Sequence, residues 1–407
     1  MTGDGALCLL PAYALGRQSA PSPAATIWSN RMWSPHNYKE QGLEKGLSDE
    51  LLERAISQSE DVIERNHDLP SILSLKHLSV RTCTSHQKLT RFVAREEFSY
   101  EKFSIKKRSG GRRFIYIPEP TLLHVQRWIN EFILKPIPVH QASFAFNPGS
   151  SIRKCAAKHC GAKWLIKLDI TDFFESISEI QVYRLFREFG YQPLVAFQLA
   201  RICTIATPEM SPRRKFNNWK VRRKNKNIPR YNQRILGYLP QGGATSPIIS
   251  NLVMRELDSE FSKIARKYRL VYTRYSDDIT FSTRANTFER DSGRRLITEV
   301  YNLLNLSGYK PQYRKTKIVP PSAKKIVLGL NVDGRAPRLQ KEFKDNIRQH
   351  FYYVETLGLS EHIVNRGFDS VWGFKCHLKG LIDYANSIEP EYARKLVVRF
   401  NNIDWPV

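Results

Sequence analysis

Hydrophobic and polar positions alternate with different periods along this 407-residue chain, and each period predicts an element. Apolar residues recur at helical spacing over 48–67 and again in SILSLKHLSV, so two helices are expected early in the chain. Residues 103–120, FSIKKRSGGRRFIYIPEP, alternate on both sides of a glycine pair, which predicts a β-hairpin. The next segment, TLLHVQRWINEFIL, returns to helical spacing, so a helix should follow the hairpin.

Two later runs have the pattern of strands that carry carboxylates. The run KWLIKLDITDFF is mostly apolar up to Asp169, as expected of a buried strand that delivers one acid to the edge of a sheet. Helical spacing resumes over 178–203. The stretch VYTRYSDDITFS, residues 271–282, places Asp277 and Asp278 between two runs of β-branched and aromatic residues, which predicts a second hairpin.

A long helix is expected between these strands. The segment LPQGGATSPIISNLVMRELDSEFSKIARKY predicts a glycine loop followed by a helix, with Ser246 as N-cap and Pro247 at its first position. Another helix is expected near 287–306, then a strand turn in KKIVLGLNVDG, then a mostly helical segment from Leu339 onward. The core face of the long helix is predicted to consist of Ile248, Leu252, Val253, Leu257, Phe261 and Ile264.

Charge adds an expectation about partners. The chain has 64 Lys and Arg residues against 39 Asp and Glu residues, a formal net charge of +25. A polyanion gains from such an excess through Coulomb attraction and counterion release, so nucleic acid is the first candidate partner. A basic surface that is simply solvated remains the alternative. With 41% hydrophobic residues, the chain can bury a large core and form more than one domain or subdomain.

The most basic segment is residues 209–234, which contain ten Lys or Arg and one acidic residue, interleaved with three aromatic residues. That composition does not predict a packed element. A solvated loop and a nucleic-acid clamp both remain open. The basic residues taken as candidates for nucleic-acid contact are Arg213, Arg214, Lys215, Arg222, Arg223 and Lys224.

Cysteine usage indicates a reducing compartment. The six cysteines are scattered without a CxxC pair, so neither a disulfide framework nor a zinc ribbon is indicated, and a cytoplasmic location is expected. The group CAAKHC, 155–160, has ligand types for a metal, but buried thiols are the simpler expectation. No apolar run is long enough to span a membrane. Residues 1–45 are expected to form a poorly ordered leader, and translation starting at Met32 is left open.

The adjacent aspartates alone are compatible with simple turn chemistry. Asp169 changes that interpretation, because three acids converge if the two predicted elements are neighbours in one sheet. Their repulsion is then tolerable only with cations between them. Two Mg²⁺ ions about 3.5–4 Å apart would clamp the attacking and leaving oxygens of an in-line phosphoryl displacement. Carboxylates are suitable ligands for that hard cation.

The order KLDITDFF, LPQGGATSP, YSDDITFS, VLGL resembles the palm of a reverse transcriptase, and is most similar to bacterial retron reverse transcriptases. The similarity runs from about Ser71 to the C-terminus. It implies an α+β right hand with fingers, a ferredoxin-like palm and a helical thumb. Residues 46–335 would hold the N-terminal helices, fingers and palm, with the basic insert at 209–234. Residues 336–407 would form the RNA-binding thumb.

The resemblance also implies roles for single residues. Asp169, Asp277 and Asp278 correspond to the triad that binds two Mg²⁺ ions. Phe174 corresponds to the aromatic that packs under the incoming sugar, with a core phenylalanine as the alternative and Phe173 expected in the core.

Further residues are implied around the nucleotide. Arg113 corresponds to the arginine that grips the triphosphate, a role that Arg112 could take instead. Gln241 and Gly242 belong to the loop beneath the nucleotide, where glycine permits close backbone approach. Lys315, in RKTKIV, corresponds to a lysine near the leaving pyrophosphate.

Two short elements carry the narrower retron resemblance. Retron enzymes resemble one another in an NAxxH element and a VTG element. This chain has CAAKH, with Cys155 where Asn is usual, and VLG, with Leu328 where Thr is usual. It also has YSDD where YADD is commoner. These departures leave the triad intact.

The implied function is an RNA-directed DNA polymerase that uses dNTPs to copy part of a structured noncoding RNA, which serves as template and primer. Its product would be single-stranded DNA joined to RNA, in antiphage defence, and an effector protein encoded nearby is left open. One alternative is a stand-alone defence or group II intron-like reverse transcriptase. A second is a non-catalytic RNA-binding protein on the same fold.

Overall fold

A computed structural model describes residues 34–106, 110–206 and 236–406 of the chain. The first 33 residues of the expected leader and the whole basic insert at 209–234 lie outside these ranges, and with the insert lie its six candidate nucleic-acid residues. Contacts divide the chain into two compact units, Met1–Glu60 and Asp61–Val407, which are described separately.

The described part of the first unit is helical. Helix α2, Pro35–Glu44, lies inside the segment expected to be a poorly ordered leader, so that expectation is wrong for these residues. The helix forms because Ser34 caps it, accepting a hydrogen bond from the Asn37 amide at 3.3 Å, and because proline favours the first helical position. Helix α3, Asp49–Arg65, confirms the first predicted helix.

The second unit continues with short helices and the first hairpin. Helices α4, Leu75–Arg81, and α5, His86–Ala94, precede strands β1, Tyr100–Lys106, and β2, Arg112–Pro118. The strands pair antiparallel from Tyr100 opposite Pro118 to Lys106 opposite Arg112, which confirms the predicted hairpin. Gly110 and Gly111 have φ of 84° and 83°, values that glycine adopts without steric cost.

A four-stranded antiparallel sheet forms the palm, with strand order β4-β5-β3-β6. Its members are β3, Trp164–Asp169; β4, Val271–Tyr275; β5, Asp278–Thr283; and β6, Lys317–Val319. Helices separate β3 from β4 and β5 from β6, whereas β4 and β5 form a hairpin. This βαββαβ connectivity is the ferredoxin-like arrangement that was expected.

The helices around the sheet differ from expectation at two points. Residues 178–203 form two helices, because Gly190 bends the chain with φ of 94° and Pro193 starts a new helix. The long helix predicted after the glycine loop is capped by Thr245, with Ser246 already helical, and breaks at Met254. The helices are α6, Pro120–Ile129, continued by a π-helix at Asn130–Leu134; α7, Ile152–Ala157; α8, Phe173–Ser176; α9, Glu179–Glu188; α10, Pro193–Cys203; α11, Ser246–Val253; α12, Arg255–Lys267; and α13, Arg290–Leu306.

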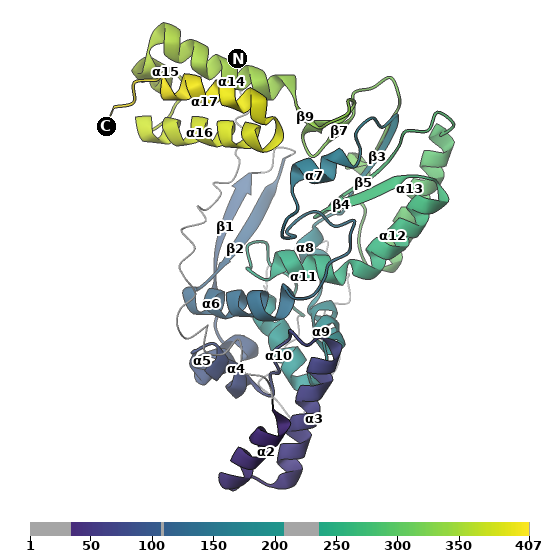
Figure 1. The fold of residues 1–407 in the computed structure, drawn as a ribbon, viewed down its shortest axis with the longest axis vertical. Helices are drawn as coiled ribbons and strands as arrows, with labels where there is room; N and C mark the ends of the chain where they lie inside the picture. Colours follow the sequence, from purple (N-terminus) through teal and green to yellow (C-terminus); the bar gives the residue numbers. More distant parts are fainter. Residues whose placement is uncertain (1–33, 107–109, 207–235, 407) are drawn as a thin grey trace. The chain divides into compact units, whose positions relative to one another are not determined.

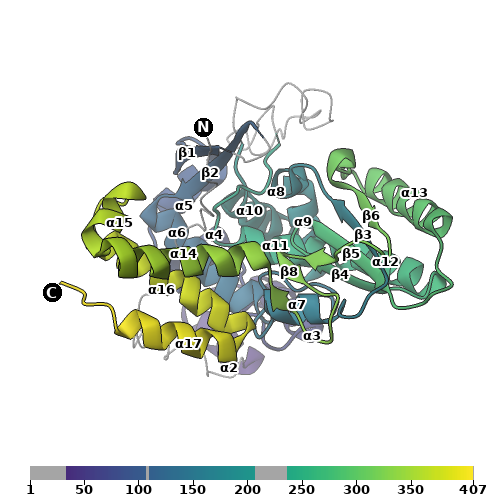
Figure 2. The same cartoon turned by 90° about the horizontal axis from the view of Figure 1, so that it is seen from above.

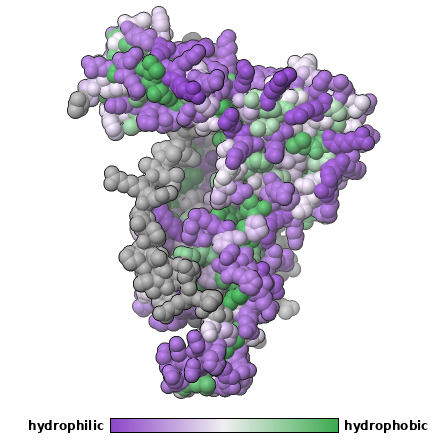
Figure 3. Space-filling view, viewed as in Figure 1, coloured by the Kyte–Doolittle hydropathy of each residue, from purple (hydrophilic) through white to green (hydrophobic). Residues whose placement is uncertain are grey.

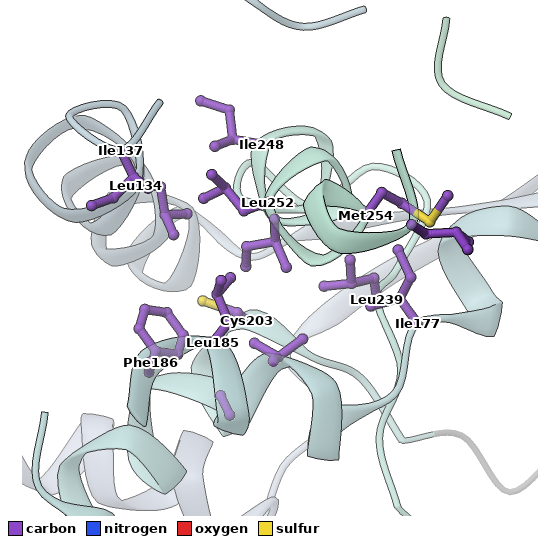
Figure 4. Packing of buried hydrophobic residues seen from close by; sticks show 14 of the residues in the cluster. Leu134, Ile137, Ile177, Leu185, Phe186, Cys203, Leu239, Ile248, Leu252 and Met254 are labelled. Carbon is purple, nitrogen blue, oxygen red and sulfur yellow. The ribbon is translucent and has the colours of Figure 1, made fainter. Parts of the chain in front are cut away.

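One hydrophobic cluster fills the space between these helices and the palm sheet. Figure 4 shows part of it, where Met254, at the end of α11, lies near Leu239, and Phe186 of α9 lies near Cys203 of α10. The predicted core face of the long helix is confirmed, since five of its six residues are buried and Val253 is partly buried. Truncating such a side chain to alanine typically costs about 2–5 kcal/mol, so this packing holds the sheet in place.

A second cluster underlies the C-terminal helices. A small antiparallel sheet of β7, Ile326–Val327; β8, Leu330–Asn331; and β9, Arg338–Leu339 leads into α14, Lys341–Leu357; α15, Leu359–Asn365; α16, Val371–Ile388; and α17, Pro390–Asn401. Figures 1 and 2 show these helices grouped together beside that sheet. The cluster also includes Leu165 of β3, so the C-terminal helices share a core with the palm.

Val327 and Leu330 already belong to the second cluster, so the hydrophobic clusters do not divide at residue 335. The expected boundary between palm and thumb at 335/336 stays a prediction. On the face drawn in Figure 3, hydrophilic residues cover most of the C-terminal helices. Within the described ranges, no helix is both long and apolar enough to cross a membrane.

Candidate active site

Three carboxylates meet at one end of the palm sheet. Strand β3 ends at Asp169, which pairs directly with Asp278 at the start of β5. Tyr275 pairs with Asp278, so Ser276 and Asp277 form a two-residue turn between β4 and β5. The Ile170 amide also donates to the Asp277 carbonyl at 3.3 Å. The structure therefore brings together the acids on which the sequence interpretation depends, and their role as metal ligands stays a prediction.

The turn itself has an unusual backbone. Ser276 has φ of 58°, in the left-handed region that residues other than glycine, asparagine and aspartate seldom adopt. Such a conformation is retained only where the surroundings hold it, and it is common in functional sites. The residue before the adjacent aspartates is thus held in a strained conformation.

The acids repel one another in a partly buried setting. Burial, together with the neighbouring charges of Asp277 and Asp169, raises the pKa of Asp278 to about 6. Burial also raises the pKa of Asp169, against the opposing hydrogen bond from Lys315. The sheet edge therefore holds more negative charge than it can easily accommodate, which favours a bound cation.

Lys315 lies against this charge. Its Nζ donates to Asp169 Oδ2 at 2.7 Å, and its own pKa is raised because the pairing with Asp169 outweighs its burial. The lysine belongs to a 3₁₀ turn, Tyr313–Lys315, and the Gln312 amide before it donates to the Asp169 carbonyl at 2.8 Å. The expected place of Lys315 near a pyrophosphate stays a prediction, and the contact observed is with the triad.

The donor set fits Mg²⁺ by its chemistry, because carboxylate oxygens are the ligands that this cation prefers. In the described part of the chain, however, no three His, Cys, Asp or Glu side chains already lie close enough to hold a metal ion. Lys315 supplies the countercharge of Asp169 in this arrangement. Two Mg²⁺ ions held by the triad therefore remain a proposal.

The two phenylalanines after β3 have different surroundings. Phe173 is buried in the core, as expected, and Phe174 is only half-buried. The ring of Phe174 lies 6.1 Å from that of Phe146, an exposed residue with φ of 57°. Sequence reasoning missed Phe146, because FAFNPGS has no strand or helix periodicity to mark it. Of Phe173 and Phe174, only Phe174 therefore has a partly accessible ring.

The glycine loop, which contains Gln241 and Gly242, contacts the hairpin of β1 and β2, called the fingers hairpin from here on. The Tyr116 amide donates to the Gln241 carbonyl at 2.7 Å. Gly242 has φ of 110°, and a Cβ there would lie 2.5 Å from the Tyr116 carbonyl oxygen. Glycine is required here for both conformation and space. The expected place of this loop beneath the nucleotide stays a prediction.

Arg112 and Arg113 begin strand β2 of that hairpin, and both are exposed. Arg112 donates to Ser104 across the hairpin at 3.3 Å. The arginines thus belong to a different sheet from the three carboxylates, joined to the palm through the contact of β2 with the glycine loop. Their grip on a triphosphate stays a prediction.

The CAAKH segment is attached to the palm sheet. His159 is buried, and its two ring nitrogens lie 2.7 Å from the hydroxyls of Ser282 on β5 and Thr273 on β4. Burial lowers the pKa of His159 to about 4 and raises the pKa of Cys155 to about 11. The thiol and neutral imidazole agree with a structural role, in line with the expectation of buried thiols.

A buried ion pair behind the turn was missed from sequence. Arg274 and Asp258 are both fully buried, and the guanidinium binds both carboxylate oxygens at 2.7 Å. The signals were present, because Asp258 lies beside Leu257 on the apolar face of its helix and Arg274 shares a strand face with Tyr272. Periodicity alone could not pair them.

Known proteins resemble the chain over most of its length. A sequence model of the family described as reverse transcriptase (RNA-dependent DNA polymerase) matches residues 105–332. The chain is 30% identical over 320 residues to the retron Ec73 reverse transcriptase of Escherichia coli, covering 75% of this chain and 88% of that one.

Two further relatives agree. The retron Ec86 reverse transcriptase of Escherichia coli is 24% identical over 345 residues, with 84% and 92% coverage. The retron Mx65 reverse transcriptase of Myxococcus xanthus is 29% identical over 310 residues; the match covers 74% of this chain but only 64% of that enzyme, less than two thirds of its length. The chain therefore belongs to the reverse transcriptase family of RNA-directed DNA polymerases, within its retron type.

Proposed function

We propose that this chain copies part of a structured noncoding RNA, which serves as both template and primer, into single-stranded DNA that stays joined to RNA. The observation that carries the proposal is the placement of Asp169 directly opposite Asp278, with Asp277 beside them at the end of adjacent strands. The retron reverse transcriptases among its relatives support the choice of a dedicated RNA partner.

In this proposal the triad residues hold the catalytic cations. Two Mg²⁺ ions bound there would stabilise the attacking and leaving oxygens of the displacement. Asp278, with a pKa raised to about 6 by burial and its acidic neighbours, loses its proton near neutral pH and becomes a full ligand. The hydrogen bond from Lys315 favours the ionised form of Asp169, against the burial that raises the pKa of this acid.

The residues around the triad would select the nucleotide. A planar guanidinium suits phosphate oxygens, so Arg113, or Arg112 in its place, would bind the triphosphate of an incoming dNTP. Phe174 presents a half-buried ring after β3 and would exclude a 2′-hydroxyl. Gln241 and Gly242 would form the floor under the nucleotide, since their backbone lies against β2.

The partner proposal draws on charge and on the relatives. A net charge of +25 favours binding of a polyanion such as RNA and the DNA–RNA product. Cytoplasmic residence is proposed because the five cysteines in the described part are all free. A role in antiphage defence, with an effector encoded nearby, is proposed on the resemblance to retrons alone.

The test is to express the chain with several hundred base pairs of its native flanking DNA. We expect an abundant short single-stranded DNA of one size that stays joined to RNA and becomes shorter after debranching or RNase treatment. Asp277→Asn should remove it. Active enzyme that makes only heterogeneous DNA, with no single RNA enriched on purification, would favour the stand-alone or intron-like alternative.

A further inference from the structure

Arg274 lies on β4, two residues before the strained Ser276, and is the largest of the fully buried side chains in the described part of the chain. A guanidinium has five N–H donors. Each donor of Arg274 has an acceptor: Nε bonds Asp258 Oδ1 at 2.7 Å, Nη1 bonds Asn251 Oδ1 and the Ser276 carbonyl at 3.1 Å each, and Nη2 bonds Asp258 Oδ2 at 2.7 Å and Ser143 Oγ at 3.2 Å.

The acceptors come from separate parts of the chain. Asp258 lies on α12, which packs along β4 (Figure 1), and Asn251 lies on α11. Asn251 also accepts from Ser143 at 2.8 Å and donates to the Ala145 carbonyl at 2.7 Å. The guanidinium therefore joins two helices and the 142–145 loop to the turn that carries the acids.

The backbone of Arg274 is fixed at the same point. Its amide donates to the Ala142 carbonyl at 2.7 Å, and its carbonyl accepts from the Phe144 amide at 2.9 Å. Both the main chain and the side chain are therefore held, so the guanidinium is a rigid reference for the turn. Tyr272 completes the cluster by donating its hydroxyl to Asp258 at 2.6 Å.

We propose that Arg274 is a positioning residue for catalysis, which sets the direction of the Asp277 side chain through the Ser276 carbonyl. The Ser276 carbonyl and the Asp277 amide belong to one planar peptide group, so a bond to that carbonyl fixes the plane from which Asp277 starts. The left-handed Ser276 needs such support, because its conformation is unfavourable for serine.

Stability alone accounts poorly for this arrangement. A buried ion pair is often replaceable by well-packed apolar residues without loss of stability. One N–H of the guanidinium also binds the Ser276 carbonyl of the turn rather than Asp258. The inference rests on the proposed role of Asp277 and Asp278 as metal ligands. In this proposal, Arg274 itself contacts neither substrate nor metal.

The test compares Arg274→Lys with Arg201→Lys. Lysine keeps the charge opposite Asp258 but has no planar fork to reach the Ser276 carbonyl as well. Arg201 is the matched control, because it is also buried and ion-paired, bonding Glu179 Oε1 at 2.8 Å and the Val93 carbonyl at 3.2 Å. Both variants lose guanidinium hydrogen bonds in a buried ion pair, and only Arg274 bonds a carbonyl of the turn.

Two readouts are needed, one of which does not depend on catalysis. For Arg274→Lys we expect kcat to fall roughly a hundred-fold, as for a misplacement of about 1 Å, with KM for dNTP changed less than about threefold. Hydrogen exchange of the 271–283 segment, measured without metal, should become faster. Arg201→Lys should leave both readouts near wild type even if its melting temperature falls equally.

The inference is overturned if folded Arg274→Lys keeps wild-type kcat or wild-type exchange in 271–283, or if Arg201→Lys reproduces both changes. Should Arg274→Lys fail to fold, Ser143→Ala removes one acceptor of the guanidinium and should show smaller changes of the same kind; no change in either readout would then overturn it. Asp277→Asn separates the two proposals, since DNA synthesis by that variant would refute the metal-ligand role itself.

Discussion

Lys315 Nζ donates to Asp169 Oδ2 at 2.7 Å, although the two residues are 146 positions apart in the sequence. The Asp169 side chain is almost fully buried and the Lys315 side chain is more than half exposed, so the lysine approaches the acid from the solvent side. A cation at the same carboxylate would compete with this contact. The pair therefore predicts how the site responds to metal.

Lys315→Met should increase the stabilisation that Mg²⁺ gives. Without the ammonium, the three acids repel one another more strongly, so the metal-free protein loses stability while the metal-bound protein loses less. Thermal unfolding with and without Mg²⁺ measures the difference, with Lys310→Met as a nearby control. An equal melting shift in wild type and Lys315→Met would mean that the lysine does not oppose metal binding.

The pKa of Asp278 predicts a pH dependence. Burial and its acidic neighbours raise this pKa from its ordinary value of 3.8 to about 6, so the folded state binds the proton more tightly than the unfolded state. Stability from this group is therefore present at low pH and is lost as pH rises from about 4 to about 6, by up to about 3 kcal/mol.

Asp278→Asn removes that titration. The measurement is the free energy of unfolding of the metal-free protein at several pH values, for wild type and variant. We expect the variant to gain relative to wild type as pH rises through this window, and a constant difference would contradict the raised pKa. DNA synthesis in Mg²⁺ should rise over the same window in wild type, because the metal needs the ionised acid.

Asp277→Asn should abolish DNA synthesis while folding and RNA binding remain nearly intact, because a neutral amide is a far poorer Mg²⁺ ligand than a carboxylate. The variant should be at least as stable as wild type without metal. The charge of Asp277 helps to raise the pKa of Asp278, so its removal relieves repulsion. Extension of a primed RNA template at the wild-type rate would exclude Asp277 from the site.

Local patterns were sufficient for much of the fold. Strand β3 and the hairpin of β4 and β5 follow from apolar runs and turn residues, and their pairing follows once both are placed in one sheet. The break at Gly190 could not be predicted from apolar spacing, which continues through it. A Cβ at Gly190 would lie 2.5 Å from the Asp61 carbonyl oxygen, a contact that exists only in the folded chain.

The site, like the fold, has a part that the sequence predicts and a part that it does not. The three aspartates can be identified from the sequence because strand ends and turns have local signals. The contacts around them, Lys315 with Asp169 and Arg274 with Asp258, join residues whose spacing follows no helix or strand period. A buried arginine has no signature of its own in a basic chain, so its partner had to come from the structure.

Phe174→Ala should raise ribonucleotide incorporation relative to deoxyribonucleotide, because the proposed gate is a steric contact with the 2′ position of the sugar. Phe173→Ala is the matched control. Phe173 is buried in the core, so its truncation should cost about 3–5 kcal/mol of stability without a specific change in sugar selection. Single-nucleotide extension with each sugar measures the ratio of ribonucleotide to deoxyribonucleotide incorporation. An unchanged ratio in stable Phe174→Ala would mean that Phe174 has only a packing role.

Gly242→Ala should separate the glycine loop from the fingers hairpin. The new Cβ would lie 2.5 Å from the Tyr116 carbonyl oxygen, and the backbone φ of 110° is one that alanine strongly disfavours. The neighbouring hydrogen bond, from the Tyr116 amide to the Gln241 carbonyl, should weaken as the loop moves away. We expect a loss of about 1–3 kcal/mol in stability, the usual cost of forcing such a conformation, and a raised KM for dNTP.

Gly110→Ala is the matched control, since its φ is 84° but nothing lies within 4 Å of the added Cβ. If both alanine variants raise KM equally, backbone strain rather than contact between the loop and β2 determines nucleotide binding.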